Sequence, residues 1–72
     1  MSDETKIEIQ VNGEPQFVQA ELTVADLVEQ WELVPQRLAI ELNLKILPRS
    51  SWAETKLQSG DRLEVVHFVG GG

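Results

Sequence analysis

The sequence predicts an α+β domain in which one helix packs on one face of a mixed sheet of four or five strands. Three observations lead to this prediction: several short segments alternate apolar and polar residues, one segment repeats apolar residues at helical spacing, and turn residues separate these segments. The chain has 72 residues, which is enough for one domain at most. Because only one helix is expected, it must cover one face of the sheet, and the domain has two layers.

The first third of the chain predicts a β-hairpin. Residues 6–11 alternate, with three aliphatic side chains on one side, which is typical of a half-buried strand. Asn12 and Gly13 follow at once, and because both residues accept positive φ, the pair indicates a tight turn. The return strand is expected over residues 15–20. Pro15 cannot donate a ladder hydrogen bond, so it belongs at the start of that strand or on a sheet edge.

A single helix is predicted to begin after Thr23. Thr23 is a suitable N-cap, and Asp26, three positions later, completes a pattern that resembles a capping box. Pro35 ends the helix by about Val34, because the residue before a proline avoids helical dihedrals. Apolar residues recur at helical spacing and form one stripe that we expect in the core: Val24, Leu27, Val28 and Trp31.

The middle of the chain predicts two further strands. The apolar run over residues 38–42 indicates a buried strand, and Asn43 begins a turn. A short strand over residues 45–47 then ends at Pro48.

The last third predicts a loop and the final strand. Residues 49–55 are expected to form a loop with one helical turn, from which Trp52 packs on the core. Residues 56–57 are a short extended piece, residues 59–61 form a turn, and residues 62–69 form the last strand.

Composition excludes several classes of function. The formal net charge is −6, and an acidic surface repels the phosphates of nucleic acids. Such a surface suits either simple solubility or a partner with a basic docking face. No segment approaches the roughly 20 apolar residues of a membrane span, and the polar N-terminus does not have the pattern of a signal peptide. We therefore expect a cytoplasmic protein that binds neither nucleic acid nor membrane.

Catalysis by side chains is not expected. The chain has no cysteine and no tyrosine, and His67 is its one histidine. No nucleophile-elbow motif surrounds any serine, and the carboxylates have no recognisable metal-ligand spacing. The sequence therefore predicts a protein that is not an enzyme and holds no metal or cofactor of its own.

The last strand carries a candidate partner interface. By alternation, Leu63 and Val65 face the helix, whereas Val66 and Phe68 point away from it, where a two-layer domain has nothing to bury them. Neighbouring exposed apolar side chains indicate a protein interface, and a covering loop is the alternative. His67 is either a further partner contact or a half-exposed strand residue.

Three glycines, Gly70, Gly71 and Gly72, follow the last strand without a linker. Glycine has no side chain to bury and loses the most conformational entropy on ordering, so such a run does not stabilise a fold. A peptide without side chains can thread a narrow tunnel that would reject any Cβ. The run is either a functional tail or an inert end such as a cloning scar.

We expect a single domain over residues 1–72, with residues 1–5 disordered and residues 70–72 as a flexible tail.

With these features in place, the chain resembles the ThiS family of sulfur carriers, within the ubiquitin-like β-grasp group that includes MoaD. The specific parts of the likeness are Pro48-Arg49 with Trp52 and the ending His-Phe-Val-Gly-Gly-Gly. MoaD-like chains tend to carry prolines before the glycines, where this chain has Phe68-Val69. The resemblance covers about residues 7–72 and implies the β-grasp fold.

The resemblance also implies a mechanism centred on the terminal carboxylate of Gly72. An activating enzyme of the ThiF type, using ATP and magnesium, would adenylate this carboxylate, and a persulfide protein would supply sulfur. The resulting thiocarboxylate would donate its sulfur to a thiazole synthase of the ThiG type for thiamin biosynthesis. Gly70 and Gly71 would thread the active site of the partner. The chain would then be a co-substrate rather than an enzyme.

Three alternatives remain open from the sequence. A MoaD-like carrier for molybdopterin synthesis would bind the large subunit of molybdopterin synthase instead of a thiazole synthase. A ubiquitin-like modifier would form isopeptide bonds with lysines of target proteins. A plain β-grasp interaction domain would have an inert tail.

Overall fold

The computed structural model describes residues 5–68, so the glycine run and most of the expected N-terminal disorder lie outside the described residues. Thr5 lies inside them, and its carbonyl oxygen accepts a hydrogen bond from the Ala20 N–H at 2.9 Å. The elements are β1 Lys6–Val11, β2 Glu14–Gln19, α1 Val24–Gln30, the 3₁₀ helix η1 Pro35–Arg37, β3 Leu38–Leu42, β4 Lys45–Ile46, the 3₁₀ helix η2 Arg49–Glu54 and β5 Arg62–His67. The predicted order of strands and helix is confirmed, and Val69, the last residue of the predicted final strand, lies outside the described range.

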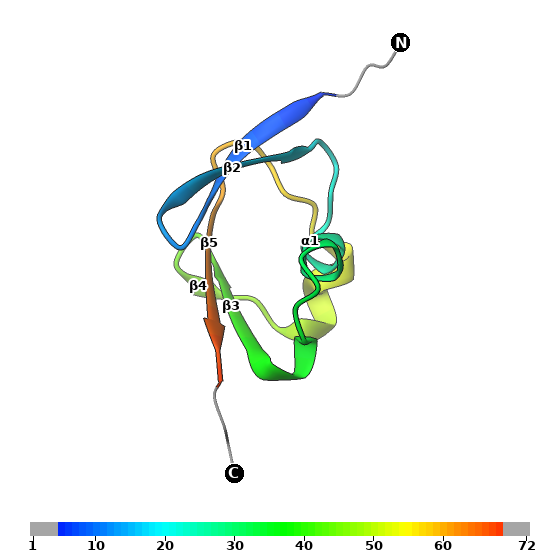
Figure 1. The fold of residues 1–72 in the computed structure, drawn as a ribbon, viewed down its shortest axis with the longest axis vertical. Helices are drawn as coiled ribbons and strands as arrows, with labels where there is room; N and C mark the ends of the chain where they lie inside the picture. The colour runs from blue at the N-terminus through cyan, green and yellow to red at the C-terminus, as the bar shows by residue number, and fades with distance from the viewer. Residues whose placement is uncertain (1–4, 69–72) are drawn as a thin grey trace.

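One mixed sheet of five strands organises the described residues. Its strand order is β2-β1-β5-β3-β4, so β5 lies in the middle and β2 and β4 are the edges. β5 pairs parallel with β1 and antiparallel with β3. Helix α1 and η2 lie together on one side of this sheet (Figure 1). The two-layer α+β prediction is thus confirmed, and Pro15 lies on an edge strand as expected.

The β1–β2 hairpin forms as its turn residues predict. Asn12 and Gly13 have φ of 52° and 84°, the positive values that a two-residue type I′ turn requires. This turn sets a register in which Ile9 lies opposite Gln16. Ile9 is fully buried and Val11 nearly so, which confirms the predicted inward face of β1.

Helix α1 begins with the predicted capping box. The Asp26 N–H donates to Thr23 Oγ1 at 3.0 Å, and the Thr23 N–H donates to Asp26 Oδ2 at 3.1 Å. Both bonds satisfy N–H groups that have no partner within the helix. The helix buries Val24, Leu27 and Val28 against the sheet, as the apolar stripe predicts.

The same helix ends in a Schellman motif that contains no glycine. The Glu32 N–H donates to the Glu29 carbonyl oxygen, and the Leu33 N–H donates to the Val28 carbonyl oxygen, both at 3.0 Å. Glu32 has a φ of 57°, a left-handed conformation in which a Cβ is disfavoured and glycine is the usual residue. The motif turns Leu33 back toward Val28.

The prediction that Trp31 belongs to the core is wrong. The helix ends at Gln30, well before Pro35, and Trp31 is its C-cap. Because the chain leaves helical geometry here, the helical spacing that aligned Trp31 with Leu27 no longer decides where the ring points. The side chain is 37% exposed.

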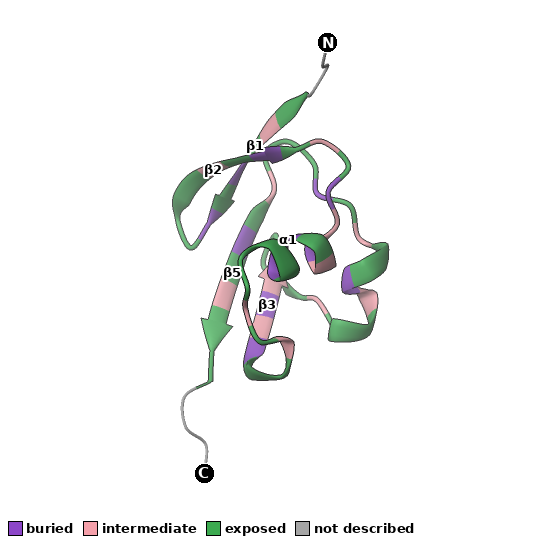
Figure 2. Cartoon of the chain, turned by 45° about the vertical axis from the view of Figure 1, so that its right-hand side comes forward, coloured by how far each residue is buried: buried purple, intermediate pink, exposed green. Residues whose placement is uncertain are grey.

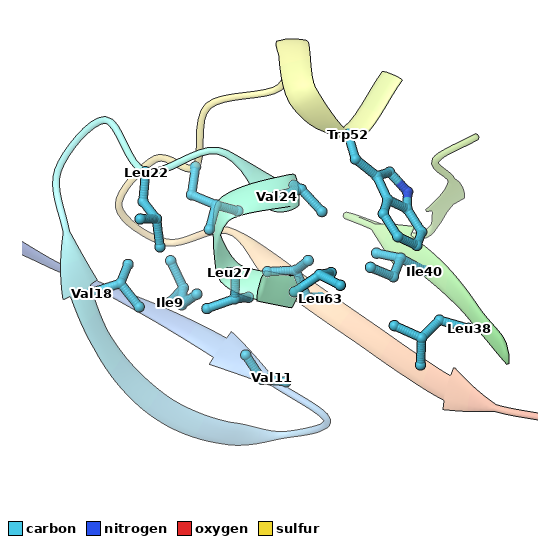
Figure 3. Packing of buried hydrophobic residues seen from close by; sticks show 12 residues of the cluster. Ile9, Val11, Val18, Leu22, Val24, Leu27, Leu38, Ile40, Trp52 and Leu63 are labelled. Atoms are coloured by element: carbon cyan, nitrogen blue, oxygen red, sulfur yellow. The ribbon is translucent and has the colours of Figure 1, made fainter. Parts of the chain in front are cut away.

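One hydrophobic core fills the space between the sheet and the helical layer (Figure 3). Trp52 is 4% exposed and projects from η2 toward Ile40 of β3, which confirms its predicted core position. Its Nε1–H donates to the Leu47 carbonyl oxygen at 3.0 Å, so the one polar atom of the ring has a partner. The buried members are Ile9, Val11, Val18, Leu22, Val24, Leu27, Val28, Leu38, Ile40, Trp52, Leu57 and Leu63.

Two asparagines in hairpin turns attach both sides of β5. Asn12 Oδ1 accepts from the Val65 N–H at 2.7 Å, and Asn12 Nδ2 donates to the Val65 carbonyl oxygen at 3.2 Å. Asn43, in the β3–β4 turn, accepts from the Arg62 N–H at 3.0 Å and donates to Asp61 Oδ1 at 3.1 Å. On the β1 side, the Asn12 amide continues the ladder of hydrogen bonds after β1 itself has ended at Val11.

We expect Glu32→Gly to raise the free energy of unfolding by about 0.5–1 kcal/mol, because glycine adopts the left-handed conformation without a Cβ clash. Urea denaturation followed by circular dichroism measures this change. Glu29→Gly, inside the helix, is the matched control and should lower the stability by about 1 kcal/mol. A loss of stability in Glu32→Gly would show that the Glu32 side chain makes a stabilising contact.

Asn12→Gly should lower the free energy of unfolding by about 1–2 kcal/mol, because it keeps the positive φ but removes two hydrogen bonds to Val65. Relative to the unsubstituted chain, the variant should show a larger increase in the amide hydrogen exchange rate at Val65 than at Gln10. The Gln10 N–H is the reference, because it donates to the Asp61 carbonyl oxygen at 2.9 Å and does not bond to Asn12. Equal acceleration at both amides would contradict a local attachment.

Candidate functional site

The candidate site begins where β5 leaves the core. Along this strand, exposure increases from Leu63, which is buried, through Val65, which is half-buried, to His67, which is exposed (Figure 2). The last described hydrogen bond of the segment joins the Phe68 N–H to the Arg37 carbonyl oxygen at 2.8 Å. The segment that follows Phe68 therefore starts from a strand anchored in the middle of the sheet.

Val66 and Phe68 are exposed, as predicted from alternation. Val66 is 52% and Phe68 is 55% exposed, and no loop within residues 5–68 buries them. Val66 lies opposite Ala39 of β3, so the two side chains share the sheet face that the helix does not cover. A partner contact through these residues stays a prediction.

His67 is separated from Val66 and Phe68 by strand alternation. It lies opposite Leu38, whose side chain faces the core, so His67 is on the helix side of the sheet but beyond the core's end. Because the Phe68 N–H bonds to Arg37, the residue just before β3, the N–H and C=O of His67 point the other way, toward the side of β1. Within residues 5–68, pairing on that side ends with Asn12 and Val65, so the backbone edge at His67 is open.

The structure adds apolar residues that the sequence analysis did not connect with Val66. Ile46 of β4 is 66% exposed and lies opposite Glu41, which in turn lies opposite Glu64. Directly opposed residues share one face of a sheet, so this row lies next to the row of Val66 and Ala39. We call Ala39, Ile46, Val66 and Phe68 the outer-face patch. Alternation predicts Val66 and Phe68, but no signal in the sequence adds Ala39 and Ile46, because their place beside Val66 depends on the strand order β5-β3-β4.

Two carboxylates lie on the same sheet face, beside the residues of the outer-face patch. Glu41 and Glu64 are directly opposite each other on β3 and β5, an arrangement that destabilises a sheet through repulsion of like charges. A partner that offers an apolar surface with basic groups would relieve this repulsion on docking. The patch therefore fits the basic docking face that the net charge of −6 suggests.

The predicted working residues Gly70, Gly71 and Gly72 lie outside the described residues. No helix within residues 5–68 has the length and apolar character needed to cross a membrane.

Comparison with known proteins places these features in a family. A family model described as the ThiS family matches residues 6–72. A thiazole synthase of Paramagnetospirillum magneticum is 40% identical over 62 residues, which cover 86% of this chain and 19% of that protein. The chain thus spans about a fifth of the length of this relative. The sulfur carrier protein ThiS of Escherichia coli is 30% identical over 66 residues, which cover 92% of this chain and 100% of that protein.

The structural comparison agrees with the sequence comparisons. The crystal structure of a thiamine biosynthesis protein, ThiS, from Geobacter metallireducens matches with a TM-score of 0.79 and 30% sequence identity, covering 92% of this chain and 100% of that chain. This match confirms the expected ubiquitin-like β-grasp fold. Because the family model extends from the first residue of β1 to Gly72, the chain belongs to the ThiS family.

Proposed function

We propose that this chain is a sulfur carrier for thiamin biosynthesis and that the carboxylate of Gly72 carries the sulfur. One observation carries the proposal: the ThiS family model covers both the β-grasp fold and the three glycines in a single match over residues 6–72. The relative from Escherichia coli that matches over its whole length is named a sulfur carrier protein, which supports the same role here.

The proposed chemistry begins with activation of the carboxylate. A carboxylate resists nucleophiles because of its charge, so an oxygen of Gly72 first attacks the α-phosphorus of ATP and pyrophosphate leaves. In the resulting acyl-adenylate, AMP is a good leaving group, and the terminal sulfur of a persulfide displaces it. A thiol then cleaves the sulfur–sulfur bond, and the products are the thiocarboxylate of Gly72 and a disulfide.

The chain contributes positioning to this chemistry. β5 is held from both sides by the asparagine bonds and by pairing with β3, so the segment after Phe68 starts from a fixed base. The glycines have no side chains, so they fit a narrow channel in a partner enzyme. Holding a reacting group in place replaces a bimolecular encounter with a far more probable intramolecular one.

Because the chain contributes only positioning, the proposed chemistry requires three partner proteins. An activating enzyme of the ThiF type would bind the ATP and magnesium, a persulfide protein would supply the sulfur, and a thiazole synthase would accept it. The long relative named thiazole synthase contains a segment similar to this chain, which supports the last partnership. The outer-face patch is the surface through which we expect the activating enzyme or the synthase to dock.

Incubation with a ThiF-type enzyme, ATP, magnesium and a persulfide donor should change the intact mass by the replacement of one oxygen atom with sulfur. Mass spectrometry of the protein taken from cells should show a chain that ends at Gly72.

Gly71→Val should fold normally but should not be adenylated, because its side chain would not fit the channel. Normal turnover of that variant, or a natural chain with further residues after Gly72, would refute the proposal.

Phe68→Asp should slow adenylation at subsaturating carrier concentrations while it leaves the fold intact, because it places a charge in the outer-face patch. Phe17→Asp is the matched control, since Phe17 is 66% exposed on β2, opposite Glu8, and lies outside the patch. Turnover measured at several carrier concentrations should show a raised KM for Phe68→Asp alone. Equal effects of the two variants would argue against docking through the patch, and unfolding of Phe68→Asp would place Phe68 in the core.

A further inference from the structure

A groove lies in the helical layer, on the opposite side of the sheet from the outer-face patch. It has a volume of about 440 Å³ and runs between the C-terminal end of α1 and the two 3₁₀ helices. Its floor is apolar and includes Val28, Leu33 and Trp52. Glu29 and Glu32 line the same groove. The groove therefore combines an apolar surface with two carboxylates, whereas the buried residues of the core are all apolar.

The floor of the groove is held in place by contacts of its own. The Schellman motif fixes Leu33 next to Val28 through the 3.0 Å bond between their backbones. Trp52 is fixed by burial and by its bond to the Leu47 carbonyl oxygen. A ligand would therefore meet a preformed surface, which lowers the entropic cost of binding.

The charges around the groove favour a cation. Neither Glu29 nor Glu32 forms an ion pair within the described residues. α1 has no basic residue in its last turn, so the partial negative charge of the helix C-terminus adds to that of the two carboxylates. The guanidinium of Arg49 does not neutralise them in a salt bridge but donates to the Pro35 carbonyl oxygen at 3.2 Å.

Glu32 occupies a position where its backbone conformation favours another residue. At a φ of 57° after the end of a helix, glycine is the usual choice. The backbone bonds of the Schellman motif accompany this conformation, but no hydrogen bond or ion pair within residues 5–68 involves the Glu32 carboxylate. Since Glu21 and Leu44 also have a positive φ, the conformation alone does not identify a site, but the Glu32 carboxylate, unpaired within the described residues, lies beside the groove and is available for an external contact.

We propose that this groove binds an arginine side chain presented by an apolar segment of a partner protein. The guanidinium is planar and pairs with carboxylates through directed hydrogen bonds, and apolar neighbours of the arginine would cover Val28 and Leu33. Because the groove and the outer-face patch lie on opposite sides of the sheet, the occupant of the groove would not compete with a protein docked on the patch. This inference rests on the groove alone and is independent of the proposed sulfur chemistry.

The test uses the full chain labelled with nitrogen-15 and the peptide acetyl-Leu-Arg-Leu-amide. The control peptide has citrulline in place of arginine, which keeps the shape and removes the charge. We expect saturable shifts of the Val28 and Leu33 amides and of the Trp52 indole N–H with the arginine peptide. The citrulline peptide should bind about fivefold more weakly, as expected for loss of a partly exposed ion pair.

Variants separate the groove from general attraction to an acidic protein. The double variant Glu29→Gln with Glu32→Gln should weaken binding of the arginine peptide about fivefold. The double variant Glu8→Gln with Glu14→Gln removes the same charge from exposed positions of the β1–β2 hairpin and should leave the affinity unchanged. Glu32→Gly should bind more weakly although it is the more stable protein, which a purely structural role for Glu32 would not produce.

Three results would overturn the proposal. One is the absence of shifts at the groove up to the solubility limit of the arginine peptide. Another is equal affinity for the arginine and citrulline peptides, which would show that the carboxylates do not select a cation. The third is a set of shifts centred on Val66 and Ala39, which would place the binding on the outer-face patch.

Discussion

The placement of β5 between β1 and β3 is the constraint on which the rest of this structure depends. β5 is the last strand in the sequence and the middle strand in the sheet, so the two hairpins can form one sheet only when the C-terminal segment joins them. Its partners are distant in sequence, and the Asn12–Val65 bonds alone close a separation of 53 residues. The segment that carries the glycines is therefore the segment that completes the fold, and the base of the proposed tail is as firmly held as the sheet itself.

The asparagines of the two hairpins show how one residue type serves a local and a distant purpose. A type I′ turn needs positive φ, which glycine would supply at least as well. Asparagine accepts the same conformation, and its amide also offers both a donor and an acceptor. Asn12 uses both on the backbone of Val65, and Asn43 divides them between Arg62 and Asp61. The turn chemistry and the docking of β5 are thus encoded at the same positions.

Local signals in the sequence predicted the elements well, because each depends on residues that are close in the chain. The Asn12-Gly13 turn, the Thr23–Asp26 capping box and the exposure of Val66 and Phe68 are of this kind. The outer-face patch was predictable only in part, since Ile46 joins Val66 and Phe68 only through the order of strands. Trp31 was misplaced because its spacing does not show that the helix ends at Gln30, one residue before it. The left-handed residue that follows is Glu32, and a glycine at that position would have indicated the end of the helix.

Carboxylates occur at two places where they weaken the fold and where exposed apolar surface lies beside them. Glu41 opposes Glu64 across β3 and β5 beside the outer-face patch, and Glu32 holds a left-handed conformation at the groove. In a chain of 72 residues the core is small, so such losses are a substantial part of the total stability. Neutral side chains at the first pair and glycine at the second would remove the cost without changing the fold. Both sites make physical sense if the missing positive charge comes from other proteins, which would meet an apolar surface flanked by acids on each side of the sheet.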